Sequence, residues 1–209
     1  MSDNNNTAVQ KIKFERTFCM IKPDGVKRGL IGDIILRIEK AGLKIVAMKM
    51  LVPTADQVRH HYPMSDDAWV ARLGEKSLSS FENIEANAKD VLGSEDKAVI
   101  GKNVADSLIE FMTSGPVVAI VVEGIQARDM IRKLAGHTLP FMADVGTIRG
   151  DYSVDSPAVA NVEMRAIHNL FHASETVEEA ENEINLWFEG EDIPGYNLGS
   201  EAIMYAKYY

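Results

Sequence analysis

The sequence has one cysteine, no long hydrophobic segment and a deficit of positive charge. Because Cys19 is the only cysteine, no disulfide can form within the chain, and its place in the apolar run 17–21 predicts a buried, reduced thiol. No apolar run approaches the ~18 residues that a transmembrane helix requires. The segment MSDNNNTAVQ at the start lacks the layout of a signal peptide. We therefore expect a soluble protein with a cytoplasmic location.

The excess of positive charge that polyanion-binding proteins use is missing. The chain has 22 lysines and arginines against 31 aspartates and glutamates, a formal net charge of -9. A field of that sign repels nucleic acid and acidic lipid. A nucleic-acid-binding regulator is therefore a weak hypothesis, and neither nucleic acid nor membrane is expected as a partner. Any anionic ligand must be small and must be bound by a local group of cations.

Two common phosphate-binding motifs are also missing. Gly101 and Lys102 are followed by Asn103 and have no glycine five positions before them, which excludes a Walker-type loop. The glycines within 25–32 have the wrong spacing for a dinucleotide-binding fingerprint.

The remaining pattern predicts one α+β domain. At 209 residues the chain has room for one sizeable domain. Apolar runs predict strands, and amphipathic periodicity predicts helices. The order fits ferredoxin-like split βαβ units, a sandwich of an antiparallel sheet with helices on one side. We expect strands at 16–21, 43–52, 117–122 and 169–171, and helices at 29–42, 53–62, 104–112, 125–135 and 176–188.

Four segments fall outside this pattern. Residues 1–14 are polar and predict a flexible N-terminus ahead of a domain that spans 15–209. Residues 63–101 are less regular, and we expect an insertion with some helix or a long functional loop. A long glycine-punctuated loop is expected at 136–151, followed by a second irregular stretch.

Candidate ligand-binding side chains lie near the ends of these elements. Lys22 follows the first strand, Arg132 lies in the helix before Gly136, and Thr138 and Arg149 lie in the long loop. Taken singly, each is readily explained as a solvent-exposed side chain. Only their convergence in the fold would indicate an anion site.

Five histidines are candidates for a nucleophile or base. His60 and His61 lie late in a predicted helix, where a positive charge complements the helix dipole, so a surface role is expected for both. His137 lies in a glycine-containing loop, and His168 has no partner that the sequence identifies. His172 closes a short apolar run before the last helix, and the residues alone are as compatible with a core histidine as with a catalytic one.

Four motifs in the same order resemble nucleoside diphosphate kinases. They are MIKPDGV at 20–26, MTSGPVV at 112–118, GTIRGD at 146–151 and NLFHAS at 169–174. The resemblance extends over about 15–188, with insertions at about 63–101 and 154–165. It implies a phosphotransferase that moves the γ-phosphoryl group of a nucleoside triphosphate to a nucleoside diphosphate by a ping-pong mechanism through a phosphohistidine.

The resemblance also implies a role for each candidate residue. His172 matches the histidine that becomes phosphorylated, with Ser174 as its neighbour, and Glu183 matches the carboxylate that holds the unreacted ring nitrogen. Side chains that match those around the phosphoryl group or the sugar are Lys22, Tyr62 and Asn169. Nucleotide-binding side chains by the same match are Lys22, Arg132, Thr138, Arg149 and Asn169.

The chemistry of phosphoryl transfer agrees with these roles. Transfer depends on positioning and charge neutralisation, which a lysine, two arginines and Mg2+ supply. A neutral imidazole is a good nucleophile near pH 7, and a carboxylate on its second nitrogen fixes the tautomer. The resemblance implies Mg2+ carried on the nucleotide phosphates, with no metal ligand from the protein. It further implies a homo-oligomer, either a tetramer or a hexamer.

The sequence departs from the family at two positions. Val104 stands where an aromatic side chain usually stacks on the base, so we expect a helical flap in the first insertion to supply Trp69 or Phe81 instead. Ala173 replaces a common glycine after the histidine, which implies a small backbone adjustment. A catalytically silent nucleotide-binding or interaction module is the alternative function, and the complete set of catalytic groups argues against it.

Overall fold

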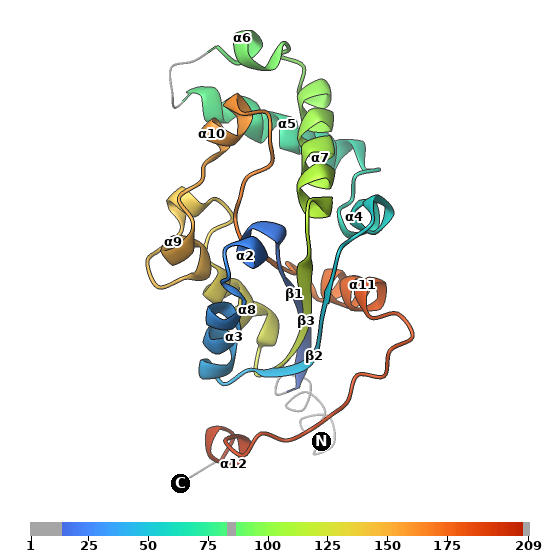
Figure 1. The fold of residues 1–209 in the computed structure, drawn as a ribbon, viewed down its shortest axis with the longest axis vertical. Coiled ribbons are helices and arrows are strands. Elements are labelled where there is room, and N and C mark those ends of the chain that lie inside the picture. Colours follow the sequence, from blue (N-terminus) through green and yellow to red (C-terminus); the bar gives the residue numbers. More distant parts are fainter. Residues whose placement is uncertain (1–13, 83–86, 207–209) are drawn as a thin grey trace, which may run out of the picture.

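A four-stranded antiparallel sheet forms the centre of the fold (Figure 1). The computed structural model describes residues 14–82 and 87–206, so nearly all of the predicted flexible N-terminus lies outside the described residues. The sheet order is β2-β3-β1-β4, and each neighbouring pair is antiparallel, which confirms the predicted α+β ferredoxin-like fold. The strands are β1 (Glu15–Ile21), β2 (Lys44–Leu51), β3 (Val117–Gly124) and β4 (Phe171–Ala173).

Helices make up most of the rest of the described chain. Among the described residues, no helix combines the length and the apolar character needed to cross a membrane. A short 3-10 helix, η1 (Pro140–Met142), lies between α8 and α9. The helices are α2 (Pro23–Lys27), α3 (Ile31–Lys40), α4 (Ala55–His61), α5 (Asp67–Glu82), α6 (Ala88–Leu92), α7 (Lys97–Thr113), α8 (Ala127–Ala135), α9 (Ile148–Tyr152), α10 (Pro157–Val162), α11 (Val177–Trp187) and α12 (Glu201–Met204).

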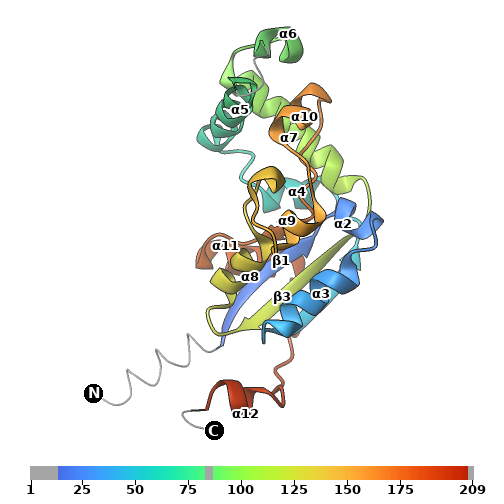
Figure 2. The same cartoon turned by 90° about the vertical axis from the view of Figure 1, so that its left-hand side faces the viewer.

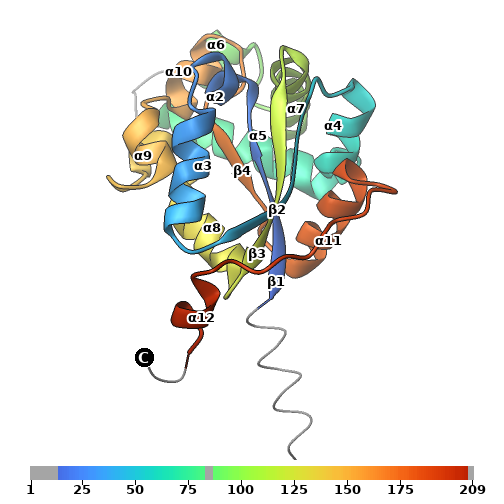
Figure 3. The same ribbon diagram turned by 60° about the horizontal axis from the view of Figure 1, so that its bottom comes forward.

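Helices cover both faces of the sheet (Figures 2 and 3). α3 and α8 pack on one face around Cys19 and Ile120, while α4, α7 and α11 pack on the other around Phe18 and Ala119. The prediction of helices on one side only is therefore wrong. The physical reason lies in β3, whose eight residues are all buried, because a strand with two apolar faces needs a covering layer on each.

The elements differ from the predicted ones mainly at their ends. α7 begins at Lys97 instead of residue 104, because the Asp96 carboxylate caps it by accepting a hydrogen bond from the amide of Ala98 at 2.8 Å. The stretches expected to be irregular contain η1, α9 and α10. At the start of α11, the Thr176 hydroxyl accepts a hydrogen bond from the Glu179 amide at 3.1 Å, which caps the helix.

The first predicted insertion is a packed helical hairpin. α5 and α7 approach so closely that a Cβ on Gly74 would lie 1.9 Å from the carbonyl oxygen of Lys97. A Cβ on Gly101 would lie 1.9 Å from the carbonyl oxygen of Val70. Neither position can accept a side chain without moving the other helix. The hairpin is therefore held at two points by backbone contact.

α10 joins this hairpin to the second predicted insertion. The buried Asn161 side chain of α10 accepts a hydrogen bond from Ser77 Oγ at 2.6 Å and donates one to Ser80 Oγ at 2.9 Å. Buried polar groups that satisfy one another in this way fix the relative position of the segments that carry them. The two predicted insertions consequently pack against each other.

The C-terminal segment returns to the lower end of the sheet, where α12 lies (Figure 1). It is held by the buried Lys44 of β2, whose Nζ lies 2.8 Å from Glu123 Oε1, 3.2 Å from Glu201 Oε1 and 2.6 Å from the carbonyl oxygen of Tyr196. No element was predicted in this segment, because no apolar periodicity marks it.

Candidate active site

His172 lies on β4, an edge strand of the sheet that pairs with β1, and His172 itself stands opposite Met20. The residue two before it, Leu170, has a φ of 67°, a left-handed conformation that is costly for a branched side chain. Hydrogen bonds on both sides hold this bend: Lys22 N donates to Leu170 O at 2.8 Å, and Leu170 N donates to Asp24 Oδ2 at 3.0 Å. The loop after β1 therefore fixes where Asn169 and His172 lie.

One nitrogen of His172 is already engaged. Nε2 lies 2.7 Å from Oε1 of Glu183, and Oε2 of the same carboxylate lies 2.5 Å from Ser174 Oγ. Glu183 comes from α11, where it shares the buried face with Ala180 and Trp187. Because Nε2 is bound, Nδ1 is the ring nitrogen left for another partner, and the side chain is still 12% exposed.

Burial sets the protonation states of this pair. Desolvation, with a contribution from the charge of Lys22, lowers the pKa of His172 to about 3. Desolvation raises the pKa of Glu183 to about 7, against the opposing effects of His61 and Ser174. The imidazole is therefore neutral near pH 7, which is the form that can act as a nucleophile.

A second histidine, His61, lies beside His172 and Glu183, and these three residues form what we call the histidine cluster. Its Nδ1 lies 3.1 Å from Oε1 of Glu183, and its ring centroid lies 4.4 Å from that of His172. The prediction of a surface role for His61 is wrong, because its side chain is fully buried. The helical periodicity could have predicted this burial. Val58, three residues earlier on α4, is also buried and lies on the same face of the helix as His61.

Tyr62 lies beside both histidines. Its ring is 4.5 Å from that of His61 and 6.2 Å from that of His172, measured between centroids. The buried hydroxyl has no hydrogen-bond partner among the described residues. A buried hydroxyl without a partner is costly, so it is available to a ligand.

Lys22 and Asn169 form the other side of the site. Lys22 Nζ donates to Asn169 Oδ1 at 2.8 Å, and Asn169 Nδ2 donates to the carbonyl oxygen of Thr138 at 3.0 Å. Desolvation and the charge of Arg149 lower the pKa of Lys22 to about 8. The ammonium group therefore remains largely charged near pH 7.

A polar cavity of about 70 Å³ adjoins β4. The buried Arg149 donates hydrogen bonds to the carbonyl oxygens of Gly136 at 2.7 Å, Phe171 at 2.6 Å and Asn169 at 3.3 Å, and burial lowers its pKa to about 10. The cavity is lined by Arg132, Ala135, Gly136, Thr138, Arg149 and Ala173. Three of the predicted nucleotide-binding side chains, Arg132, Thr138 and Arg149, thus converge on a cavity that reaches β4 at Ala173, the residue after His172.

Three side chains of the histidine cluster have the spacing of metal ligands. Donor atoms of His61, His172 and Glu183 all lie within 4.8 Å of one another. The hydrogen bond of 2.7 Å between His172 and Glu183, with His61 Nδ1 3.1 Å from the same carboxylate oxygen, accounts for the arrangement.

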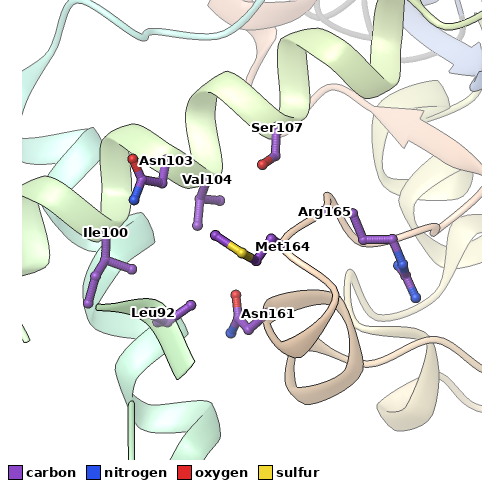
Figure 4. Close-up of a pocket in the computed structure, with 8 residues that line it drawn as sticks. All are labelled: Leu92, Ile100, Asn103, Val104, Ser107, Asn161, Met164 and Arg165. Carbon is purple, nitrogen blue, oxygen red and sulfur yellow. The ribbon is translucent and has the colours of Figure 1, made fainter. Parts of the chain in front are cut away.

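A second cavity, of about 80 Å³, lies between α6, α7 and α10 (Figure 4). Val104 and Met164 point toward each other across it. The prediction that Phe81 can stack on a base is wrong, since only 2% of Phe81 is exposed. Trp69 stacks against Tyr62 with centroids 6.3 Å apart, which places it beside the histidine cluster.

Comparisons with known proteins agree on one family. Residues 15–71 and 95–193 match the family model described as nucleoside diphosphate kinase. The unmatched residues 72–94 lie within the insertion predicted at 63–101. A nucleoside diphosphate kinase from Pyrobaculum aerophilum is 44% identical over 179 residues, which cover 86% of this chain and 97% of that protein.

Two solved structures are similar over most of their length. The crystal structure of an NDP kinase from Pyrobaculum aerophilum has a TM-score of 0.81 and 42% identity, covering 86% of this chain and 98% of that one. A nucleoside diphosphate kinase from Borrelia burgdorferi, described as a transition-state mimic with bound vanadate and ADP, has a TM-score of 0.71 and 35% identity, covering 91% and 96%.

Proposed function

The chain belongs to the nucleoside diphosphate kinase family and is a phosphotransferase, and we propose that it transfers the γ-phosphoryl group of a nucleoside triphosphate to a nucleoside diphosphate through a phosphohistidine at His172. The observation that supports this most is the contact of 2.7 Å between Nε2 of His172 and Glu183, which leaves Nδ1 free. The adjacent cavity, lined by two arginines and a threonine, is suited to the phosphates.

The proposed reaction has two halves. In the first, the lone pair of Nδ1 forms a bond to the γ-phosphorus while the bond from that phosphorus to the bridging oxygen breaks, and its electron pair leaves with the nucleoside diphosphate. In the second, a terminal oxygen of another diphosphate attacks the same phosphorus, and the imidazole leaves with its lone pair restored. The ring carries positive charge while it is phosphorylated, and ionised Glu183 offsets that charge.

The remaining residues bind and position the nucleotide in this proposal. Lys22, Arg132, Thr138 and Arg149 contact phosphate oxygens, and Asn169 orients Lys22 through the bond at 2.8 Å. The unpartnered hydroxyl of Tyr62 binds the phosphoryl group or the sugar. The relative from Borrelia burgdorferi, described with vanadate and ADP, supports nucleoside phosphates as the substrates.

Mg2+ enters with the nucleotide in this proposal. None of the six residues that line the cavity of about 70 Å³ beside β4 is a carboxylate, so its wall offers partners for phosphate oxygens and not for a metal ion. When bound, Mg2+ neutralises charge on the phosphates during transfer. A cytoplasmic location, where nucleotides are abundant, belongs to the same proposal.

Labelling with γ-labelled ATP tests the proposed function directly. The expected product is a labelled protein that loses its label in acid, keeps it in base and passes it to added GDP or UDP. His172→Gln is expected to bind ADP and to take up no label. A protein that binds ADP but is never labelled would instead be a silent nucleotide-binding module.

A further inference from the structure

A second histidine faces the carboxylate that binds His172. Oε1 of Glu183 is 2.7 Å from Nε2 of His172 and 3.1 Å from Nδ1 of His61, while Oε2 is 2.5 Å from Ser174 Oγ. The Glu183 side chain is buried, so water does not solvate it. The carboxylate therefore has hydrogen bonds with His172 and Ser174 in place of water, and His61 lies close enough to donate a third.

We propose that His61 is a positioning residue, which donates a hydrogen bond from Nδ1–H to Oε1 of Glu183 and thereby keeps this carboxylate ionised and directed at Nε2 of His172. This inference rests on the proposed phosphohistidine function. His61 does not touch the substrate and acts only through Glu183.

The consequence for His172 is the choice of tautomer. An ionised Glu183 accepts a hydrogen bond from Nε2–H of His172. The proton therefore stays on Nε2, and Nδ1 keeps its lone pair. A protonated Glu183 would donate to Nε2, and the neutral ring would then carry its proton on Nδ1, where no phosphoryl group can bind. Hydrogen bonds to the ionised form favour that form, so each added donor shifts the balance toward the nucleophilic tautomer.

The surroundings of His61 decide which nitrogen carries its proton. Nε2 of His61 is buried and has no hydrogen-bond partner among the described residues. A proton on Nε2 would be a buried donor without an acceptor, whereas a proton on Nδ1 reaches the carboxylate. In the structure the indole N–H of Trp187 donates to Nδ1 at 3.3 Å, so the proposed tautomer replaces this hydrogen bond by the shorter contact of 3.1 Å with a charged acceptor.

Two substitutions of His61 separate positioning from packing. In His61→Asn the amide nitrogen lies near the position of Nδ1 and can donate to Glu183, whereas the longer His61→Gln places its amide near Nε2. We expect His61→Asn to phosphorylate at nearly the native rate in single-turnover experiments with ATP. We expect His61→Gln to be slower by about ten- to hundredfold, the loss of one hydrogen bond to a charged group, with ADP affinity unchanged. Both variants are measured at a temperature at which both are folded. Equal phosphorylation rates in His61→Asn and His61→Gln would overturn the proposal.

Nitrogen NMR of the histidine side chains tests the same proposal without nucleotide. The native protein is expected to carry the proton of His61 on Nδ1 and that of His172 on Nε2, and His61→Gln is expected to shift His172 toward the Nδ1–H form. A native His61 with its proton on Nε2 would refute the proposal even if neither variant folds. If the native protein takes up no phosphoryl group, the proposed function fails, and the tautomers still decide the role of His61.

Discussion

At the scale of single residues, burial determines what the site can do. Desolvation keeps His172 neutral, because its pKa falls to about 3, and brings the pKa of Glu183 up to about 7. A neutral imidazole retains a lone pair on Nδ1 as long as Nε2 holds the proton, and Nε2 holds it as long as Glu183 is ionised. In the proposed mechanism, the nucleophile is thus controlled by a carboxylate whose pKa lies near neutrality.

A pH profile tests this control. The pKa of Glu183 is raised, so its protonated form is populated at a higher pH than for an ordinary glutamate, and the phosphorylation rate is expected to fall as pH drops below about 7. Glu183→Gln is expected to bind ADP normally and to be phosphorylated more slowly than the native protein at pH 8. Its phosphorylation rate should no longer show the fall below pH 7, the acid limb of the profile. The measurement is single-turnover phosphorylation at saturating ATP between pH 5 and 9. An identical acid limb in Glu183→Gln would assign the limb to another group.

Arg149 is expected to serve both binding and stability. Arg149→Ala removes hydrogen bonds to three carbonyl oxygens, so ADP affinity, turnover and the midpoint of thermal unfolding should all fall. A hydrogen bond to a charged group contributes about 1.5–3 kcal/mol, or about ten- to hundredfold in affinity. The matched control is Arg132→Ala, whose side chain is 43% exposed and should affect binding without changing the unfolding midpoint. Calorimetry and thermal unfolding measure both, and an Arg149→Ala protein of native stability would contradict the structural part.

Sequence motifs identified most of the candidate residues that the fold brings together, but not all of them. Lys22, Asn169 and His172 lie within contiguous motifs, so a match of short segments located them. His61 was missed because its role depends on α11, more than a hundred residues later, reaching across to α4. Hydrogen bonds of that range leave no local pattern, and only the periodicity with Val58 indicated burial.

At the scale of elements, the order of strands and helices followed from apolar periodicity, while their packing did not. Strand β3, in which every residue is buried, contains a continuous apolar run in the sequence. Such a run predicts a buried strand but not whether helices cover one face of the sheet or both. The α5–α7 hairpin was predicted to be partly irregular because of its serine-rich stretch 77–80 and its polar stretch 82–96, and the sequence did not single out Gly74 and Gly101. In the fold these glycines are the contact points between the two helices.

Gly101→Ala tests that contact. The new Cβ would lie 1.9 Å from the carbonyl oxygen of Val70, so α5 and α7 must separate, which is expected to cost about 1–3 kcal/mol of unfolding free energy. Gly32→Ala in α3 is the matched control, because a Cβ there meets nothing within 4 Å and removes backbone freedom from the unfolded chain. Denaturant unfolding should therefore show Gly101→Ala destabilised and Gly32→Ala unchanged or slightly more stable. Equal stability of the two variants would show that the helices can shift apart freely.

At the scale of the whole molecule, one edge of the sheet carries apolar side chains without a cover. β2 is an edge strand, and its Met48 and Met50, with Val52 just beyond, are exposed. Exposed apolar side chains on an edge strand are common where chains associate. They support the homo-oligomer that the family resemblance implies.

Sedimentation velocity tests this assembly. We expect a species of four or six chains at micromolar concentration, that is, a multiple of the 23.1 kDa chain mass. Replacing Met48 and Met50 with lysine should shift the distribution toward smaller species if this edge lies in the interface. A native protein that sediments as a single 23.1 kDa chain would contradict the prediction.

The most direct measurement identifies the ring nitrogen that carries the phosphoryl group. The protein, labelled with nitrogen-15 at histidine, is phosphorylated with ATP and examined by phosphorus and nitrogen NMR. Because Nε2 of His172 is held by Glu183 at 2.7 Å, the phosphoryl group is expected on Nδ1 of His172, with its proton retained on Nε2. Addition of GDP should then remove the signal. A phosphoryl group on Nε2, or on any other residue, would contradict the proposed mechanism.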